Sequence, residues 1–292
     1  MTPSSQETST SPGPHTEFFS KPAYLTVSSQ LHLEALASSI ARVYTLSPCF
    51  RAERSQTNRH LAEFWMLEAE WAWTKEVGDV CELVEACVKD ALGSGRDERA
   101  WLAKGAAGQE ERARSLETTA GPAPWARMTY TEAISELEQY HASAASRARP
   151  FAFAPKWGHA LQSEHEKWLS EVLAQGPVFV TDYPSTLKPF YMRINDDEKT
   201  VACFDLLVPF VGELVGGSLR EERLEPLEKR MASYGLDPAG EEYGWYVDLR
   251  RYGSAPHGGF GMGLERLVSW VSGVENVREC IAMPRWTKRM LL

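Results

Sequence analysis

The chain has 292 residues, which is long enough for one large domain or two modest ones with a full hydrophobic core. Hydrophobic residues make up 43% and charged residues 24%, the balance of an ordinary globular protein. No apolar run approaches the roughly 18 to 20 residues that cross a bilayer, so we expect no membrane partner. The net charge of -9 does not by itself favour a nucleic-acid partner, because nucleic acids usually bind a basic face of a protein. Five scattered cysteines without a CxxC pair argue against a disulfide framework or a zinc knuckle and indicate a reducing compartment.

The first 17 residues are predicted to be a disordered lead-in. They are rich in Ser, Thr and Pro and contain neither Arg nor Lys, so they match neither a secretory signal nor an Arg-rich transit peptide. We therefore expect a cytoplasmic protein, with a mitochondrial one as the alternative. The folded domain is predicted to span residues 18–292.

The spacing of apolar residues predicts strands and helices in mixed order. A short strand is expected at 24–28 and a helix from residue 33. Between 93 and 124 the chain is rich in Gly, Ala, Glu and Arg with little periodicity, which predicts a charged insertion or mobile connector. Consecutive strands that are expected to pair as hairpins, with helices inserted between them, favour an α+β domain built on an antiparallel sheet. The remaining predicted strands are 43–53, 62–70, 178–181, 190–194, 200–208, 211–216 and a glycine-rich one near 258–263, and the remaining helices are 80–92, 130–141, 163–173, 221–234, 241–252 and one from 264.

The first candidate site is the predicted hairpin over 43–70. Pairing of its strands would bring Arg51 and Glu53 close to Phe64, while Arg59 and His60 lie on the polar loop between the strands. An arginine fixed on a strand can bind phosphate in a forked geometry, and a loop arginine can close on a more distant phosphate. Phe64 offers a flat surface for an adenine ring. The alternative is a solvated charged hairpin with a phenylalanine in the core.

The glycine-rich strand is the second candidate. Alternating glycines, among them Gly261 and Gly263, remove the side chains from one strand face, so a flat ring can approach closely. Arg266 follows in the first turn of a helix, where a phosphate is favoured. The run is no P-loop, because no Gly-Lys-Ser/Thr follows it.

Asp205 and Glu213 are the third candidate, on two consecutive predicted strands. Two carboxylates beside a tight bend suit Mg²⁺ that is shared with substrate phosphates. They could equally be ordinary charges at strand ends. The conjunction of phosphate-binding arginines, a carboxylate pair and an aromatic platform in one domain favours a nucleotide site.

Long segments of the chain resemble the class II aminoacyl-tRNA synthetases. FRAERSQTNRHLAEFWMLEAE looks like motif 2 and GGFGMGLERLVSWVSGVENVRECIAMPR looks like motif 3. The segments FFSKPAYLTVSSQLHLEA, TDYPSTLKPFYMRINDDEKTVACFDLLVP, GELVGGSLREERLE and YGWYVDLRRYGSAPHGGFG resemble blocks of the asparaginyl-tRNA synthetases in order, and LSPCFRAERS and AMPRW look most like fungal mitochondrial versions. The resemblance covers about residues 18 to 285, apart from the connector at 93–124, and implies the class II antiparallel sheet flanked by helices.

The resemblance implies a role in ATP binding and adenylate formation for each matching residue. Arg51 would bind the α-phosphate and the carboxylate of the amino acid. Glu53 and Phe64 would lie at the adenine, and Arg266 at the γ-phosphate. The rest of the implied set is Arg59 and His60 at the outer phosphates, Gly261 and Gly263 beneath ATP, and Asp205 and Glu213 on Mg²⁺. No protein nucleophile is implied, so catalysis would be positioning plus neutralisation of charge.

Asparagine is the amino acid that the resemblance implies. Aspartate-specific relatives carry a lysine where this chain has Leu33, within the stretch from Gln30 to Glu34 that would bind the amino acid. Without that cation a carboxylate side chain is disfavoured. Glu34 accepting from the carboxamide NH₂ and Arg220 donating to its C=O would select asparagine.

Two family features have no visible counterpart in this sequence, namely the N-terminal anticodon-binding OB-fold and motif 1, which builds the homodimer interface. We therefore expect an N-terminally truncated catalytic core that forms asparaginyl-adenylate and transfers it to tRNA(Asn). One alternative is a stand-alone paralogue that passes an Asn or Asp adenylate to ammonia or a small amine. Another is a non-catalytic interaction protein that retains the fold.

Overall fold

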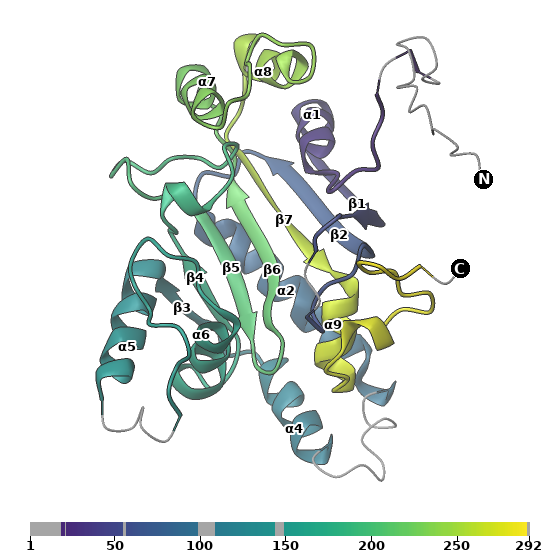
Figure 1. Ribbon diagram of the computed structural model, residues 1–292, viewed down its shortest axis with the longest axis vertical. Coiled ribbons are helices and arrows are strands. Elements are labelled where there is room, and N and C mark those ends of the chain that lie inside the picture. Colours follow the sequence, from purple (N-terminus) through teal and green to yellow (C-terminus); the bar gives the residue numbers. More distant parts are fainter. Residues whose placement is uncertain (1–18, 21, 55–56, 99–108, 144–148, 291–292) are drawn as a thin grey trace, which may run out of the picture.

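A computed structural model describes residues 19–20, 22–54, 57–98, 109–143 and 149–290. The predicted lead-in at 1–17 lies outside these residues. Figure 1 shows one central sheet with helices around it, and helices α7 (Leu224–Ser233) and α8 (Gly244–Arg251) project together beyond one end of the strands. None of the described helices is long and apolar enough to cross a membrane.

The sheet has seven strands in the order β1-β2-β7-β6-β5-β4-β3. All neighbours are antiparallel except β3 and β4, which are parallel. This confirms the predicted α+β class and the predicted hairpin, in which β1 pairs with β2. From one edge to the other the strands are β1 (Arg42–Phe50), β2 (Glu63–Ala72), β7 (His257–Gly263), β6 (Gly212–Leu219), β5 (Cys203–Val208), β4 (Val178–Thr181) and β3 (Ala126–Thr129).

The main core lies between one face of this sheet and helix α2 (Val77–Ser94), which Figure 1 shows crossing behind the strands. Val80, Val84 and Val88 repeat at helical spacing and are buried against the sheet, as the sequence predicts. Helix α9 (Leu264–Ser272) continues directly from β7 and adds Trp270 to the same cluster. The opposite face of the central strands is thereby left open for a site.

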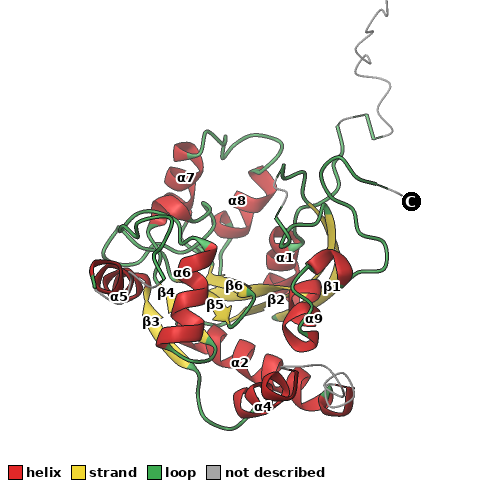
Figure 2. Cartoon of the chain, turned by 60° about the horizontal axis from the view of Figure 1, so that its bottom comes forward, coloured by secondary structure: helices red, strands yellow, loops and turns green. Residues whose placement is uncertain are grey.

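The other helices cover the flanks of the sheet, as Figure 2 shows from a second direction. Helix α1 (Gln30–Ile40) lies along β2, and α7 packs on α8 in a small cluster of its own. Beside β4 and β5 a second apolar cluster contains Tyr130 and Leu137 of α5, both fully buried. Its helices are α5 (Tyr130–Ala142), α6 (Ser163–Trp168) and the π-helical turn Leu169–Leu173.

Two element predictions, the strands at 24–28 and 190–194, were wrong. Residues 24–28 form no strand, because this extended segment makes only isolated contacts, such as the Thr26 carbonyl accepting from Phe50 N at 2.8 Å. The stretch 190–194 makes isolated bridges instead of a strand. The predicted connector contains helix α4 (Gln109–Thr119), whose Leu116 is buried in the main core, although residues 99–108 lie outside the described residues.

A substitution at Gly217 in β6 tests how closely this sheet is packed. A Cβ at Gly217 would lie 2.5 Å from the Phe204 ring and 2.7 Å from the Gly259 carbonyl oxygen, which belongs to rigid backbone. We expect Gly217→Ala to lower the free energy of unfolding by about 2 kcal/mol in urea titrations. Gly93→Ala is the matched control, because nothing lies within 4 Å of its Cβ position in α2, and its stability should be unchanged or slightly higher. Equal losses in both variants would contradict this account of the packing.

Candidate active site

Strand β2 divides its side chains between core and site. Leu67, Ala69 and Trp71 pack into the main core, so the alternate residues Phe64, Met66, Glu68 and Glu70 face the open side of the sheet. On the neighbouring strand β7 a Cβ at Gly261 would lie 2.5 Å from the Met66 methyl group. A side chain there would displace the end of Met66 and project into the open face, so the glycine keeps this face free of side chains.

The larger of two cavities on this face has a volume of about 700 Å³. Arg51, Gln30 and Arg220, three of the predicted amino-acid-binding residues, line it, and so do Asp205 and Glu213. Glu68, Glu70, Lys188 and Tyr191 also line this cavity.

A second cavity of about 310 Å³ adjoins the first. Every residue that the sequence implies for ATP lines it, although these residues come from two strands, a loop and a helix. They are Arg51, Glu53, Arg59, His60, Phe64, Gly261, Gly263 and Arg266. The two cavities share Arg51, which therefore lies where their contents would meet.

Most charges around the cavities are already paired. Arg220 donates to Glu70 at 2.9 Å, Lys188 to Asp205 at 2.7 Å, and Arg266 to Glu213 at 3.1 Å. Burial raises the pKa of Asp205, whereas at Glu213 the effect of burial is outweighed by Arg266 and Lys188, which lower its pKa. Each of these carboxylates therefore has a cation of the protein itself as a partner.

Two side chains differ from this pattern. The Glu68 carboxylate accepts from Ser29 N at 2.9 Å and from the Ser28 hydroxyl, and no cation among the described residues pairs with it. Arg51 has no carboxylate partner within the described parts of the chain, and its guanidinium carbon lies 5.0 Å from the centre of the Phe64 ring. One cavity therefore offers a free anion and a free cation, the complement of a zwitterionic α-amino acid.

Several cations surround the smaller cavity. Arg59 pairs with Glu166 of α6 at 3.0 Å and donates to Ser163 at 2.7 Å, so the loop is tied to a distant helix. Burial lowers the pKa of the His60 imidazole, and the nearby Arg266 and Arg59 lower it further. The Glu53 carboxylate, 3.4 Å away, opposes this change. The three arginines that line this cavity are side chains suited to phosphate.

Asp205 and Glu213 converge on Gly216. A Cβ on that glycine would lie 3.6 Å from an Asp205 oxygen and 3.3 Å from a Glu213 oxygen. Two carboxylates close to one glycine suit a magnesium ion that takes its other ligands from phosphate and water, and Lys188 Nζ lies 2.7 Å from both Asp205 oxygens at the same place. The described residues contain no cluster of three or more His, Cys, Asp or Glu that could hold a metal by themselves.

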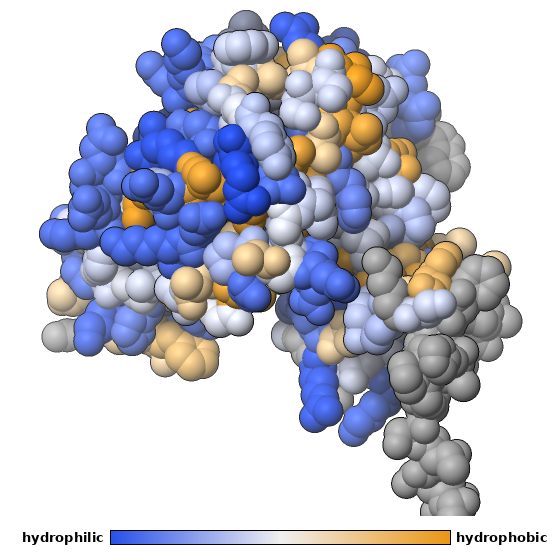
Figure 3. Space-filling model, turned by 90° about the horizontal axis from the view of Figure 1, so that it is seen from above, coloured by the Kyte–Doolittle hydropathy of each residue, from blue (hydrophilic) through white to orange (hydrophobic). Residues whose placement is uncertain are grey.

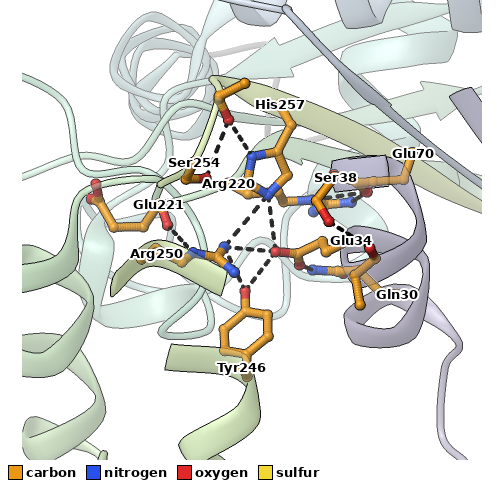
Figure 4. A network of polar contacts seen from close by, with 12 residues as sticks. Gln30, Glu34, Ser38, Glu70, Arg220, Glu221, Tyr246, Arg250, Ser254 and His257 are labelled. Atoms are coloured by element: carbon orange, nitrogen blue, oxygen red, sulfur yellow. Dashed lines mark hydrogen bonds and ion pairs between the residues drawn. The ribbon is translucent and has the colours of Figure 1, made fainter. Parts of the chain in front are cut away.

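Glu34, which the resemblance places at the amino acid, does not reach the surface of the larger cavity in this structure. Glu34 is only 2% exposed and does not line the larger cavity. Figure 4 shows its carboxylate held by Tyr246 and Arg250 of α8 and by His257 of β7. It therefore lies behind Gln30, in a polar network of the wall.

The sequence analysis missed three lining residues, Glu68, Glu70 and Lys188. Glu68 and Glu70 continue the two-residue period of Phe64 and Met66, and a buried carboxylate on a strand is unusual enough to have marked them. Lys188 lies in an irregular segment after the short helical turn Ser185–Leu187, and no local pattern identifies it.

Comparisons with known proteins agree with this geometry. A family model of the class II tRNA synthetases (D, K and N) matches residues 4–287. The chain belongs to this family. Among the synthetases it resembles are the asparagine–tRNA ligase of Desulfotalea psychrophila, 48% identical over 92% of this chain and 58% of the relative, and the asparaginyl-tRNA synthetase of Mus musculus, 47% identical over 96% and 57%. The chain thus spans somewhat more than half the length of these relatives.

A solved structure is similar over most of this chain. The asparaginyl-tRNA synthetase of Pyrococcus horikoshii complexed with asparaginyl-adenylate superposes with a TM-score of 0.78 at 36% identity, covering 94% of this chain and 59% of that one. The class II synthetase fold predicted from the motifs is confirmed.

A substitution of Lys188 tests whether the buried charges of this site stabilise the fold as pairs. Burial alone would lower the pKa of Lys188, but Asp205 outweighs it and raises that pKa. Lys188→Met would leave the buried Asp205 carboxylate uncompensated, and we expect a loss of about 3 kcal/mol in unfolding free energy at pH 8. Burial already raises the pKa of Asp205, and removal of Lys188 would raise it further. The carboxyl group would then be protonated more readily in the folded variant, so the loss should shrink as the pH falls toward 4.

The measurement is urea unfolding across pH 4 to 8. Lys229→Met, at an exposed position on α7, is the control and should show little change at any pH. A deficit in Lys188→Met that is independent of pH would contradict the proposed pairing.

Proposed function

We propose that this chain uses ATP to activate asparagine as asparaginyl-adenylate, for transfer to tRNA(Asn). The observation that carries the proposal is the pair of adjoining cavities with Arg51 between them. One offers a free carboxylate and a free guanidinium for an α-amino acid, and the other has the aromatic and cationic lining that a nucleotide requires. The relatives named asparagine–tRNA ligase support the choice of amino acid.

In this proposal the two substrates lie on either side of Arg51. The ammonium group of asparagine pairs with Glu68, and its carboxylate contacts the Arg51 guanidinium. Phe64 stacks on adenine, while Arg59, His60 and Arg266 neutralise the phosphates. The glycine face of β7, with Gly261 and Gly263, lets the nucleotide lie against the backbone.

The reaction needs no nucleophile from the protein. An oxygen of the asparagine carboxylate attacks the α-phosphorus of ATP, a new P–O bond forms, and the bond to the β-phosphate oxygen breaks with release of pyrophosphate. Both reactants are anions, so their approach is opposed by charge until Arg51 neutralises them. Holding them in one orientation supplies the rest of the acceleration.

Asp205 and Glu213 would hold Mg²⁺ on the nucleotide. An oxygen of each lies close to Gly216, and the ion would add positive charge next to the phosphates. Lys188 and Arg266 keep the two carboxylates oriented.

A homodimer is the proposed assembly. The edge strand β1 carries exposed apolar side chains at Tyr44 and Leu46, and the adjacent α1 carries them at Leu36 and Ile40. Figure 3, which shows the molecule from above, is hydrophilic over most of its surface, with hydrophobic side chains gathered on the right, where α1 and β1 lie in Figure 1. An unpaired edge with an apolar surface suits contact with a second copy.

ATP–pyrophosphate exchange on the purified chain tests the function. We expect exchange with asparagine to exceed exchange with aspartate at equal concentration. Arg51→Ala should lower asparagine-dependent exchange at least about 100-fold, because it removes the charge between the two substrates. Lys229→Ala, at an exposed position on α7 outside both cavities, is the control and should keep the wild-type rate. Faster exchange with aspartate would contradict the substrate assignment.

A further inference from the structure

Arg59 lies on the loop between β1 and β2, and its guanidinium is bound by two residues of α6. Nη1 donates to Glu166 Oε2 at 3.0 Å and to Ser163 Oγ at 2.7 Å. The Arg59 and Glu166 side chains are 16% and 15% exposed, so water screens this ion pair less than it screens a pair on the surface. The contact joins residues 107 positions apart and ties the loop to a helix that packs on β5 and β6.

One nitrogen of the Arg59 guanidinium has no partner. Its Nε atom is buried and lacks an acceptor among the described residues, although Arg59 lines the smaller cavity. A buried N–H group without an acceptor lowers stability and is unusual in a folded protein. Glu166 lines neither of the two cavities, so its carboxylate binds the arginine from behind. The pairing with Glu166 thus leaves part of the guanidinium for a ligand.

The ion pair is held in a confined space at the start of β6. Gly212 has a φ of +81°, and a Cβ there would collide with Glu166 Oε2 and lie 3.1 Å from Arg59 Nη2. The backbone N–H of Glu213 donates to the same Glu166 oxygen at 3.4 Å. The orientation of Arg59 is therefore fixed by packing as well as by charge.

Glu166 also lies near the two carboxylates that we assign to Mg²⁺. Burial raises the pKa of Glu166, Arg59 opposes this change, and Glu213 and Asp205 add to it. Carboxylates that raise one another's pKa repel one another, so each of them needs a cation nearby. Arg59 is the counter-charge of Glu166 at the phosphate end of the site.

We propose that Glu166 is a positioning residue for the nucleotide, which holds Arg59 so that its remaining N–H groups meet the outer phosphates of ATP. The inference rests on the proposed function and deepens it. A loop arginine without such a partner would sample many rotamers, and ordering it when ATP binds would cost conformational entropy. Glu166 orders the side chain in advance, and Ser163 adds a second acceptor on the same nitrogen.

Glu166→Ala tests the inference through the affinity for ATP, measured by calorimetric titration of the chain with ATP and Mg²⁺. We expect the Kd for ATP to rise about tenfold, because Arg59 loses its fixed orientation. In pyrophosphate exchange the KM for ATP should rise likewise, while the KM for asparagine stays within about twofold.

Glu166→Gln keeps an acceptor oxygen on a side chain of the same length and should restore part of the affinity. We expect a Kd for ATP about threefold above that of the wild type, because a neutral acceptor binds a guanidinium more weakly than a carboxylate does. Should Glu166→Ala fail to fold, this rise carries the test by itself.

Glu164→Gln is the matched control on the same helix. The Glu164 carboxylate accepts from the backbone N–H groups of Ala152 and Phe153 instead of from Arg59. This variant should bind ATP with the wild-type Kd even where its stability is reduced.

The double variant of Arg59→Ala with Glu166→Ala decides whether Glu166 acts through the arginine. If it does, the double variant should bind ATP no more weakly than Arg59→Ala alone, whereas losses from independent roles would multiply. Multiplied losses would overturn the inference. So would a folded Glu166→Ala chain with the wild-type Kd or with tighter binding, since tighter binding would mean that Glu166 competes with phosphate for Arg59.

The binding measurement also separates this inference from the proposed function. A wild-type chain that binds ATP but shows no asparagine-dependent exchange would overturn the proposed function, and the Kd values of the variants would still decide the role of Glu166. A wild-type chain that does not bind ATP would overturn both.

Discussion

The site depends on how the protein distributes charge over one face of a sheet. Glu70, Asp205 and Glu213 each have an arginine or lysine from the protein itself, and these internal pairs make a buried, strongly polar surface tolerable. Arg51 and Glu68 remain without a partner of opposite charge among the described residues. In the proposed function the substrates supply those partners, so the pairing pattern would decide where they bind and in which direction they lie.

The sheet makes this distribution possible. Strand β2 sends every second side chain into the core against α2, and the others reach the site. Strand β7 contributes glycines in the same region, where even a methyl group at Gly261 would touch Met66. Charged residues are therefore concentrated on strands that a rigid core holds from behind, which suits catalysis by positioning.

Much of this could be predicted from the sequence. The hairpin, the glycine strand and Arg266 in the following helix carry strong local patterns, and their residues meet in one cavity. Residues 24–28 and 190–194 have strand-like composition but no strand, since no neighbouring backbone pairs with them over their length. The burial of Glu34 could not be predicted, because it depends on Arg250 and His257, more than 200 residues away in the chain.

The same separation explains why Lys188 was missed. It lies in an irregular segment, and only the folded chain brings it to Asp205. Local periodicity identifies which face of a strand is buried, but it does not identify which distant charge will neutralise a carboxylate. Periodicity could have identified Glu68 and Glu70, since they follow Phe64 at intervals of two residues and so lie on the same face of β2.

Calorimetric titration of the wild-type chain with stable sulfamoyl analogues of the two adenylates tests the central claim most directly. Such analogues occupy both cavities at once and need no turnover. The account predicts that the asparaginyl analogue binds much more tightly than the aspartyl analogue and that Arg51→Ala weakens this binding strongly. Equal binding of the two analogues, or binding that is indifferent to Arg51, would contradict it.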